Sequence, residues 1–405
     1  MLGWKKQIFL INYGKREEMS KLEKKSKRQT NIELLRVLAL LLIIMYHIVR
    51  HTVKVQLVAP EKLARLPFAL YQVPQFYPRL MILHVVMTFG SIGNALFILI
   101  SGYFMANRDQ TRIKLTQTTK KLLLQLLFAA LVLTVVPTIW QEVWPDFYLS
   151  LQRFSRINDE FWFVGYYFAI ILCAKLFLNR FLGRLDQKGY ASFVLIGLAL
   201  LTFYWTNHIF ESLAEGLEVF VTGIFHYSLG GYLQKYQPLK RVRSYVLVFI
   251  PLGAMGLVVL SGYNQTQGAI HDYLTNASLQ VTPFIPKVPD YNNSSLLVLV
   301  SAVCLFELVR RIQLPQSRLI NWLGQATFMV YLIHDNSFFY SLWNGRDWLG
   351  TLAYSPWIFI FQLIKWAVDT FVAGALTYLA YQLTLALFKR SKGLFIKSIP
   401  EKTES

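Results

Sequence analysis

Residues 31–49 read NIELLRVLALLLIIMYHIV, an apolar run that carries a glutamate, an arginine and a histidine. A run of about 20 predominantly apolar residues is long enough to cross a bilayer as a helix. Ionisable side chains are costly inside a membrane and usually mark a site or a wet cavity. Arg36 and His47 are 11 positions apart. At about 100° and 1.5 Å per residue, that spacing places them on one helix face, roughly 16 Å apart along the axis.

The rest of the chain has the same apolar character. Hydrophobic residues make up 55% of the chain and charged residues 16%, against about a quarter charged in soluble domains. Apolar stretches of membrane-spanning length occur at 31–49, 82–106, 120–138, 162–179, 190–207, 217–234, 244–262, 295–312, 321–340 and 356–388. The sequence therefore predicts an all-α, polytopic membrane domain of about ten transmembrane helices over residues 31–390.

Lys and Arg residues alternate between the predicted loops. Of the 41 basic residues, 30 lie in six segments: the N-terminus, 107–121, 175–189, 235–243, 310–318 and the C-terminus. Because cytoplasmic loops retain positive charge, both termini are predicted to be cytoplasmic, as a basic arm over 1–30 (shorter if the chain starts at Met19) and a basic tail over 391–405. The net charge of +19 then faces an anionic leaflet, and no nucleic-acid partner is expected.

The cysteines and histidines of the sequence give little indication of a metal site. The two cysteines, Cys173 and Cys304, lie in predicted spans and are expected to be buried small hydrophobes. His47 and His51 form an i,i+4 pair, but the segment HIVRH lacks the glutamate of the metalloprotease helix, and a catalytic zinc usually has three protein ligands. No metal is therefore expected, and His51 is placed near the outer mouth of the helix, by the acceptor or in solvent.

Four segments carry a family resemblance: IELLRVLALLLIIMYH at 32–47, LFILISGYFM at 96–105, FWFVGYYFAI at 161–170 and FMVYLIHDN at 328–336. In order and spacing they resemble the integral-membrane acyltransferase family 3, most distinctively in the first-helix arginine and the histidine after ten intervening residues. The resemblance implies a ten-helix enzyme of the cell membrane, such as a bacterial plasma membrane. It implies transfer of acetyl or another short acyl group to sugars or lipid-linked glycans, with acyl-CoA as donor substrate and no bound cofactor.

His47 is the candidate catalytic residue. A histidine can take up and return a proton near neutral pH, as acyl transfer to a hydroxyl requires, and imidazole can also act as a nucleophile that carries the acyl group. Arg36, near the cytoplasmic end of the same helix, could grip the donor phosphates bidentately or only extend to lipid phosphates. Glu33 is expected to pair with Arg36 and orient it.

Further candidates for substrate binding are Asn94, Ser101, Trp162, Tyr331 and His334. Asn94 and Ser101 could line a cavity and polarise an acyl carbonyl, or the small residues around Ser101 could serve close helix packing. Trp162 begins an aromatic belt at the outer interface and could stack on a sugar. Tyr331 and His334, spaced i,i+3, share a helix face and could support the site or simply the packing.

The loop 107–121 corresponds to an arginine cluster in the family that the chain resembles. Its basic residues here are Arg108, Arg112, Lys114, Lys120 and Lys121. They could cradle donor phosphates, or they could reflect only the positive charge of inner loops. Glu307 and Lys365 also lie inside predicted spans, and could pair with each other.

An O-acyltransferase is the leading hypothesis for function, and a secondary transporter or flippase of glycan intermediates is the alternative. A transporter would also place charged groups in a ten-helix bundle, but no paired broken helices are evident in the sequence. A sensor or scaffold would not need Arg36 and His47 on one face. The expected partners are acyl-CoA, a cell-surface glycan or lipid-linked sugar acceptor, the lipid bilayer and, where the chain does not act alone, a separate extracytoplasmic protein.

Overall fold

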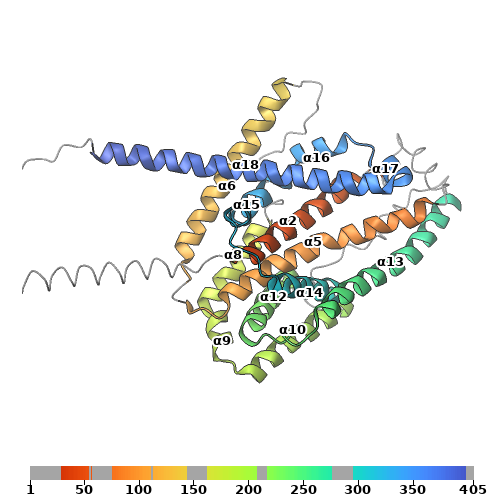
Figure 1. Cartoon of the computed structure of the whole chain (residues 1–405), viewed down its shortest axis with the longest axis horizontal. Helices are drawn as coiled ribbons and strands as arrows, with labels where there is room; N and C mark the ends of the chain where they lie inside the picture. The colour runs from red at the N-terminus through yellow and green to blue at the C-terminus, as the bar shows by residue number, and fades with distance from the viewer. Residues whose placement is uncertain are drawn as a thin grey trace, which may run out of the picture.

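The computed structural model describes residues 29–53, 56, 75–110, 113–143, 162–207, 217–275 and 295–397, and all regular secondary structure in these ranges is helical (Figure 1). The helices are α2 (Thr30–Ile48), η1 (Val49–Val53), α5 (Phe76–Met105), α6 (Leu115–Val143), α8 (Trp162–Cys173), η4 (Ala174–Leu178), α9 (Asn179–Arg184), α10 (Gln187–Asn207), α12 (Leu217–Tyr236), α13 (Ser244–Thr275), α14 (Leu296–Arg311), α15 (Arg318–His334), α16 (Ser337–Asn344), α17 (Trp348–Tyr354) and α18 (Pro356–Lys397). Residues 1–28 of the predicted arm, residues 398–405 of the tail and Arg112 lie outside the described residues.

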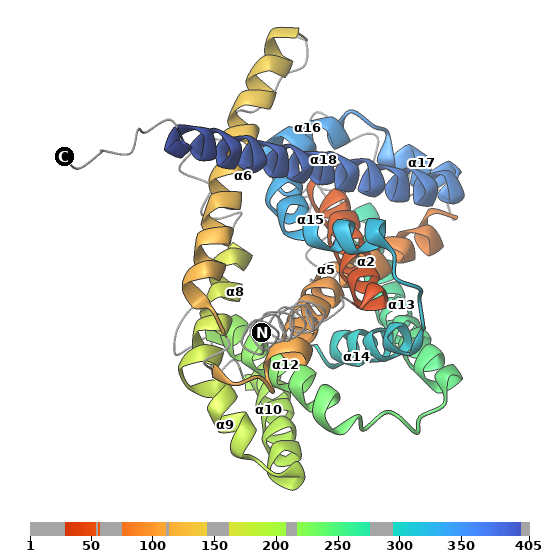
Figure 2. The same ribbon diagram turned by 60° about the vertical axis from the view of Figure 1, so that its left-hand side comes forward.

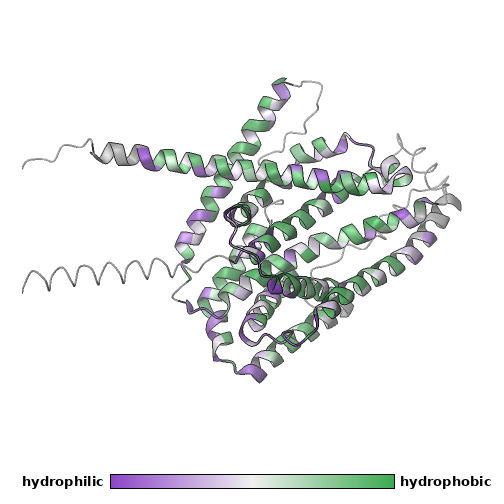
Figure 3. Cartoon of the chain, viewed as in Figure 1, coloured by the Kyte–Doolittle hydropathy of each residue, from purple (hydrophilic) through white to green (hydrophobic). Residues whose placement is uncertain are grey.

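Helices occupy all ten ranges that the sequence predicts to span the membrane. Among the described residues, six helices are long and apolar enough to cross a bilayer: Thr30–Val53, Pro78–Met105, Leu115–Val143, Trp162–Arg184, Ser244–Asn264 and Pro356–Arg390. Apolar residues dominate most helix bodies, and hydrophilic residues gather towards their ends (Figure 3). The chain thus has the helices of a multi-pass membrane protein, whereas the number of crossings and the side of the termini stay predictions.

The helix that carries Arg36 and His47, α2, lies in the middle of the bundle (Figure 2), where it contacts α5, α14, α15 and α18. Its apolar residues Ile32, Leu35, Leu40 and Ile44 are fully buried. A helix that is hydrophobic on nearly all sides is buried in this way. The few polar side chains of α2 therefore meet protein groups and not lipid.

The helices α5 and α12 approach each other closely at glycines. A Cβ atom on Gly102 of α5 would overlap the backbone of Tyr227, and one on Gly230 of α12 would overlap the carbonyl of Leu99. Small residues allow such backbone approach in membrane helices. The expectation that small residues around Ser101 serve close helix packing is therefore confirmed for Gly102. This contact fixes the backbone position of the neighbouring Ser101.

The long helices α6 and α18 cross each other at the edge of the bundle (Figures 1 and 2). Large apolar side chains on both are exposed, among them Leu127 and Leu131 of α6 and Phe361 and Leu376 of α18. In a water-soluble protein, so much exposed apolar surface would mark an interface. On helices of membrane-spanning length it is the surface expected to face lipid.

The predicted pairing of Glu307 with Lys365 is wrong. Glu307 binds the two arginines that follow it on α14, with Arg310 Nε at 2.7 Å and Arg311 Nε at 2.8 Å. Lys365 binds Asp369, with Nζ at 2.6 Å from Oδ2. Partners three or four residues along the same helix are already within reach, and they satisfy both groups.

Candidate active site

A cavity of about 430 Å³ lies between α2, α5, α6, α8 and α15. Its walls include the polar residues Arg36, Asn94, Ser101, Lys114, Gln117, Thr118, Lys121, Gln125, Gln325, Thr327 and Tyr331. A cavity of this size with a few polar groups in an apolar wall is typical of small-molecule sites. Three of the lining residues, Arg36, Lys114 and Lys121, carry positive charge, so the cavity favours an anionic group.

Arg36 is held in place by Glu33, as the sequence predicted. Arg36 Nη1 lies 3.0 Å from Glu33 Oε1 and 3.1 Å from Oε2, and the guanidinium also lies over the ring of Phe104 at 5.8 Å. Gly324 of α15 packs directly on Glu33, because a Cβ atom there would overlap the Glu33 carboxylate. Glu33 is buried, so it fixes Arg36 at the cavity wall while the guanidinium keeps further donors for a ligand.

The connection that leads from α5 to α6 is tied to η4 and α9. Lys175 Nζ donates to the carbonyls of Gln110 at 3.3 Å and Ile113 at 2.6 Å. Asn179 Nδ2 donates to the carbonyls of Met105 at 2.7 Å and Arg108 at 3.1 Å. These bonds fix the backbone immediately before Lys114 and the start of α6, which supply the basic wall of the cavity.

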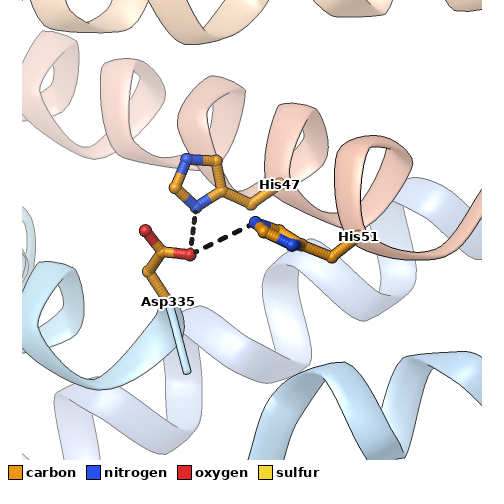
Figure 4. A group of neighbouring side chains, drawn as sticks. All are labelled: His47, His51 and Asp335. Carbon is orange, nitrogen blue, oxygen red and sulfur yellow. Dashed lines mark ion pairs between the residues drawn. The ribbon is translucent and has the colours of Figure 1, made fainter. Parts of the chain in front are cut away.

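Outside the cavity lining, the side chains of His47, His51 and Asp335, which come from two separate segments, lie close together (Figure 4). His47 Nδ1 lies 2.8 Å from Asp335 Oδ1, and His51 Nε2 lies 3.6 Å from the same oxygen. The shorter contact is an ion-pair distance but lacks the alignment of a hydrogen bond. The other ring nitrogen of His47 points away from Asp335 (Figure 4).

Aromatic rings surround this histidine–aspartate cluster. His334 stacks on His47 with ring centroids 5.0 Å apart, and Tyr340 stacks on His51 at 3.9 Å. The Tyr340 hydroxyl donates to Asp335 Oδ1. His334 is fully buried, and its Nδ1–H donates to the Tyr331 carbonyl at 2.8 Å. Two walls of the cluster therefore come from the end of α15 and from α16.

The break between α15 and α16 presents Asp335 to the histidines. Asn336 makes this break: its side chain caps α16 by accepting from the backbone N–H of Phe338 at 2.9 Å and donates to the carbonyl of Ile333. An asparagine in this role is a common N-cap. On the opposite side, α2 passes into the π-helical turn η1 at Val49, between His47 and His51. Such turns occur often at functional sites.

Tyr331 joins the two parts of the site. It lines the cavity, and its ring lies 5.7 Å from that of His334, which in turn stacks on His47. His47 itself is not among the lining residues of the cavity. The arrangement is thus a cationic cavity that ends beside a histidine cluster, with Tyr331 at the junction.

The remaining predicted residues divide into those that the structure brings to this site and those that it does not. Asn94 and Ser101 line the cavity with Arg36. Trp162 is exposed and does not line the cavity, although it packs against the lining residue Phe163 and against Tyr166. Arg108 is also exposed and outside it.

Two functional candidates, Asp335 and Gln125, were missed by the sequence analysis. Asp335 lies in the segment FMVYLIHDN and was given no role, although an ionisable residue in an apolar run is itself a signal. Gln125 of α6 lines the cavity, and nothing in its spacing separates it from the other residues of that helix. Lys114 and Lys121, which the sequence offered as donor-phosphate contacts, line the cavity as well. Asp335 also brings a third potential ligand atom within 4.8 Å of those of His47 and His51, which the segment HIVRH alone does not offer.

Comparison with known proteins gives one match. A family model described as an acyltransferase domain matches residues 29–385, which is most of the chain. No match was found among curated proteins or among solved structures.

Proposed function

The chain belongs to the acyltransferase 3 family, and we propose that it transfers a short acyl group, such as acetyl, from cytoplasmic acyl-CoA to a hydroxyl of a cell-surface glycan or lipid-linked sugar. The observation that carries this proposal is that the histidine cluster lies next to Tyr331, a lining residue of the cationic cavity. We further propose ten membrane crossings in a bacterial plasma membrane, with both termini cytoplasmic, because the basic loops alternate in that way.

The cavity is proposed as the donor site. Acyl-CoA carries phosphate and pyrophosphate groups, and a guanidinium can bind such groups through two parallel hydrogen bonds. Arg36 is oriented for this by Glu33, while Lys114 and Lys121 add point charges to the cavity wall. Asn94 follows Gly93, which packs on Ala39 and Ile43 between Arg36 and His47. Asn94 would then lie nearer the acyl end of the donor than Ser101 does, and its amide could polarise the thioester carbonyl.

His47 is proposed as the general base. The ring nitrogen that points away from Asp335 takes the proton of the acceptor hydroxyl as the hydroxyl oxygen attacks the thioester carbonyl. The bond from the acyl carbon to the CoA sulfur then breaks, and the imidazolium returns the proton to the departing thiolate. Asp335, whose carboxylate lies 2.8 Å from the other nitrogen of His47, stabilises the positive charge on the ring during this exchange.

Purified full-length protein in detergent, supplied with acetyl-CoA labelled in the acetyl group and with lipid-linked glycan, tests the proposal. Wild-type protein should label the glycan and release CoA. His47→Ala should lose at least about 100-fold in turnover, since a general base typically contributes that much or more. His226→Gln is the matched control, because His226 is a buried histidine of α12 outside the cavity lining.

Three results would contradict parts of this proposal. Turnover of His47→Ala above about a tenth of wild type would remove His47 from the reaction. Label that remains covalently attached to wild-type protein but not to His47→Ala would make His47 a nucleophile rather than a base. Glycan movement across sealed vesicles without consumption of acyl-CoA would favour the transporter alternative.

A further inference from the structure

We propose that His47, His51 and Asp335 form a binding site for a divalent transition-metal ion of the Zn²⁺ type, and that the bound ion inhibits acyl transfer. The ligand atoms of these three side chains all lie within 4.8 Å of one another. They converge from two segments far apart in the sequence, α2 with its π-helical turn and the break after α15 (Figure 4). Imidazole nitrogens with one carboxylate oxygen are the ligands of many zinc sites with three protein ligands.

The two nitrogen-to-oxygen distances lie near those of a tetrahedral ion, and side-chain rotations would bring all three ligand atoms to it. Bonds of about 2.0–2.1 Å in a tetrahedral site place neighbouring ligand atoms about 3.3 Å apart. The two nitrogen-to-oxygen distances here are 2.8 Å and 3.6 Å, one on each side of that value. Neither contact has hydrogen-bond geometry, so no well-formed hydrogen bond between a histidine and Asp335 would have to be given up when an ion inserts between the three groups.

The surroundings favour a transition metal over calcium or magnesium. Two of the three ligand atoms are imidazole nitrogens, which suit zinc and its neighbours, whereas calcium and magnesium prefer oxygen ligands. The Tyr340 hydroxyl donates to the ligating oxygen of Asp335, as outer partners of ligating carboxylates commonly do. The side chains of His47, His51 and Asp335 are 13%, 29% and 12% exposed, so an ion can reach them and a fourth position is left for water.

Inhibition follows from the position of the ion and rests on the proposed role of His47 as base. A dication bound to Nδ1 of His47 would make protonation of the same ring unfavourable, because like charges would then share one imidazole. It would also engage the Asp335 carboxylate that otherwise stabilises the imidazolium. The protein would therefore transfer acyl groups in the metal-free state and stop when the three ligands hold an ion.

Equilibrium dialysis of the purified full-length protein against Zn²⁺ tests the site directly, with Co²⁺ as a second probe whose visible absorption reports four-coordination. Wild-type protein should bind one ion per chain at this site. His51→Ala and His51→Gln should weaken binding by more than the 10- to 100-fold that loss of an outer partner costs. Arg50→Gln is the matched control: it changes the neighbouring exposed residue, removes no ligand, and should bind the ion at least as tightly.

The binding and activity results separate the two proposals. Equal Zn²⁺ binding by wild type and both His51 variants would overturn the metal site. Zn²⁺ that binds but leaves transfer unchanged, or stimulates it, would overturn the inhibition, and inhibition that persists in His51→Ala would do the same. Protein that binds the ion as expected but never transfers an acyl group would leave the metal site standing and contradict the proposed function.

Discussion

Replacement of Asp335 by asparagine removes a negative charge from beside His47 with little change in shape. The local backbone does not depend on that charge, because Asn336 makes the hydrogen bonds that cap α16 and tie it to Ile333. The Tyr340 hydroxyl, which donates to Asp335, can donate equally to an amide oxygen. We therefore expect Asp335→Asn to fold and insert as wild type does, and to lose activity through charge alone.

The magnitude follows from the distance between the two groups. At 2.8 Å, two unit charges interact by about 6 kcal/mol in a medium of effective dielectric constant 20. A general base contributes about 100- to 10,000-fold to a rate, which corresponds to about 2.7–5.4 kcal/mol. The charge of Asp335 is thus large enough to carry the whole contribution of His47, and we expect kcat to fall by at least about 100-fold.

The assay is single-turnover acetyl transfer from saturating acetyl-CoA, with thermal unfolding as a check on the fold. Tyr340→Phe is the matched control, because it removes another contact of the same carboxylate oxygen but leaves the charge. Loss of a hydrogen bond to a charged group costs about 1.5–3 kcal/mol of stability, but the negative charge beside His47 stays, so its kcat should fall by less than that of Asp335→Asn. An Asp335→Asn variant that keeps more than a tenth of wild-type kcat would refute the electrostatic role of Asp335.

Three other predictions test the donor cavity and the topology. Arg36→Lys should weaken acetyl-CoA binding at least about tenfold, because a lysine cannot grip a phosphate bidentately; unchanged affinity in both Arg36→Lys and Arg36→Ala would rule out the donor role. Gly324→Ala should destabilise the protein by about 1–3 kcal/mol in thermal unfolding and weaken donor binding, since a Cβ atom there meets Glu33; Gly165→Ala, whose Cβ meets nothing within 4 Å, should do neither. In oriented, sealed proteoliposomes, acyl-CoA should act only from the side of the basic loops and acceptor only from the other, and full activity with acyl-CoA on the acceptor side would contradict the through-membrane path.

Local spacing predicted the parts of the site that lie on one helix. The Glu33–Arg36 pair is confirmed because i,i+3 neighbours on a helix are already close, and nothing else in the fold has to be known. The same rule explains the failed Glu307–Lys365 prediction. It would have found the partners of both residues, Arg310 and Asp369, had it been applied within each helix before a contact between helices was sought.

The parts that depend on how helices assemble were not predictable from the pattern. Asp335 reaches His47 only because α15 packs on α2 and ends before Asn336, and no periodicity in either segment encodes that contact. The cavity includes Lys114 but not Arg108, six positions earlier in the same loop. Both carry positive charge, and charge alone does not say which of them turns towards the cavity.

The hydrogen bonds from Lys175 and Asn179 order the residues that they hold between α5 and α6 before any ligand binds. Ordering a loop on binding costs about 1–2 kcal/mol of backbone entropy per residue, and that cost is subtracted from the affinity for the ligand. Here four backbone carbonyls, those of Met105, Arg108, Gln110 and Ile113, are already held. The chain loses this entropy once, when it folds, so no further ordering cost for these residues would be subtracted from the affinity for an anionic ligand at the basic wall of the cavity.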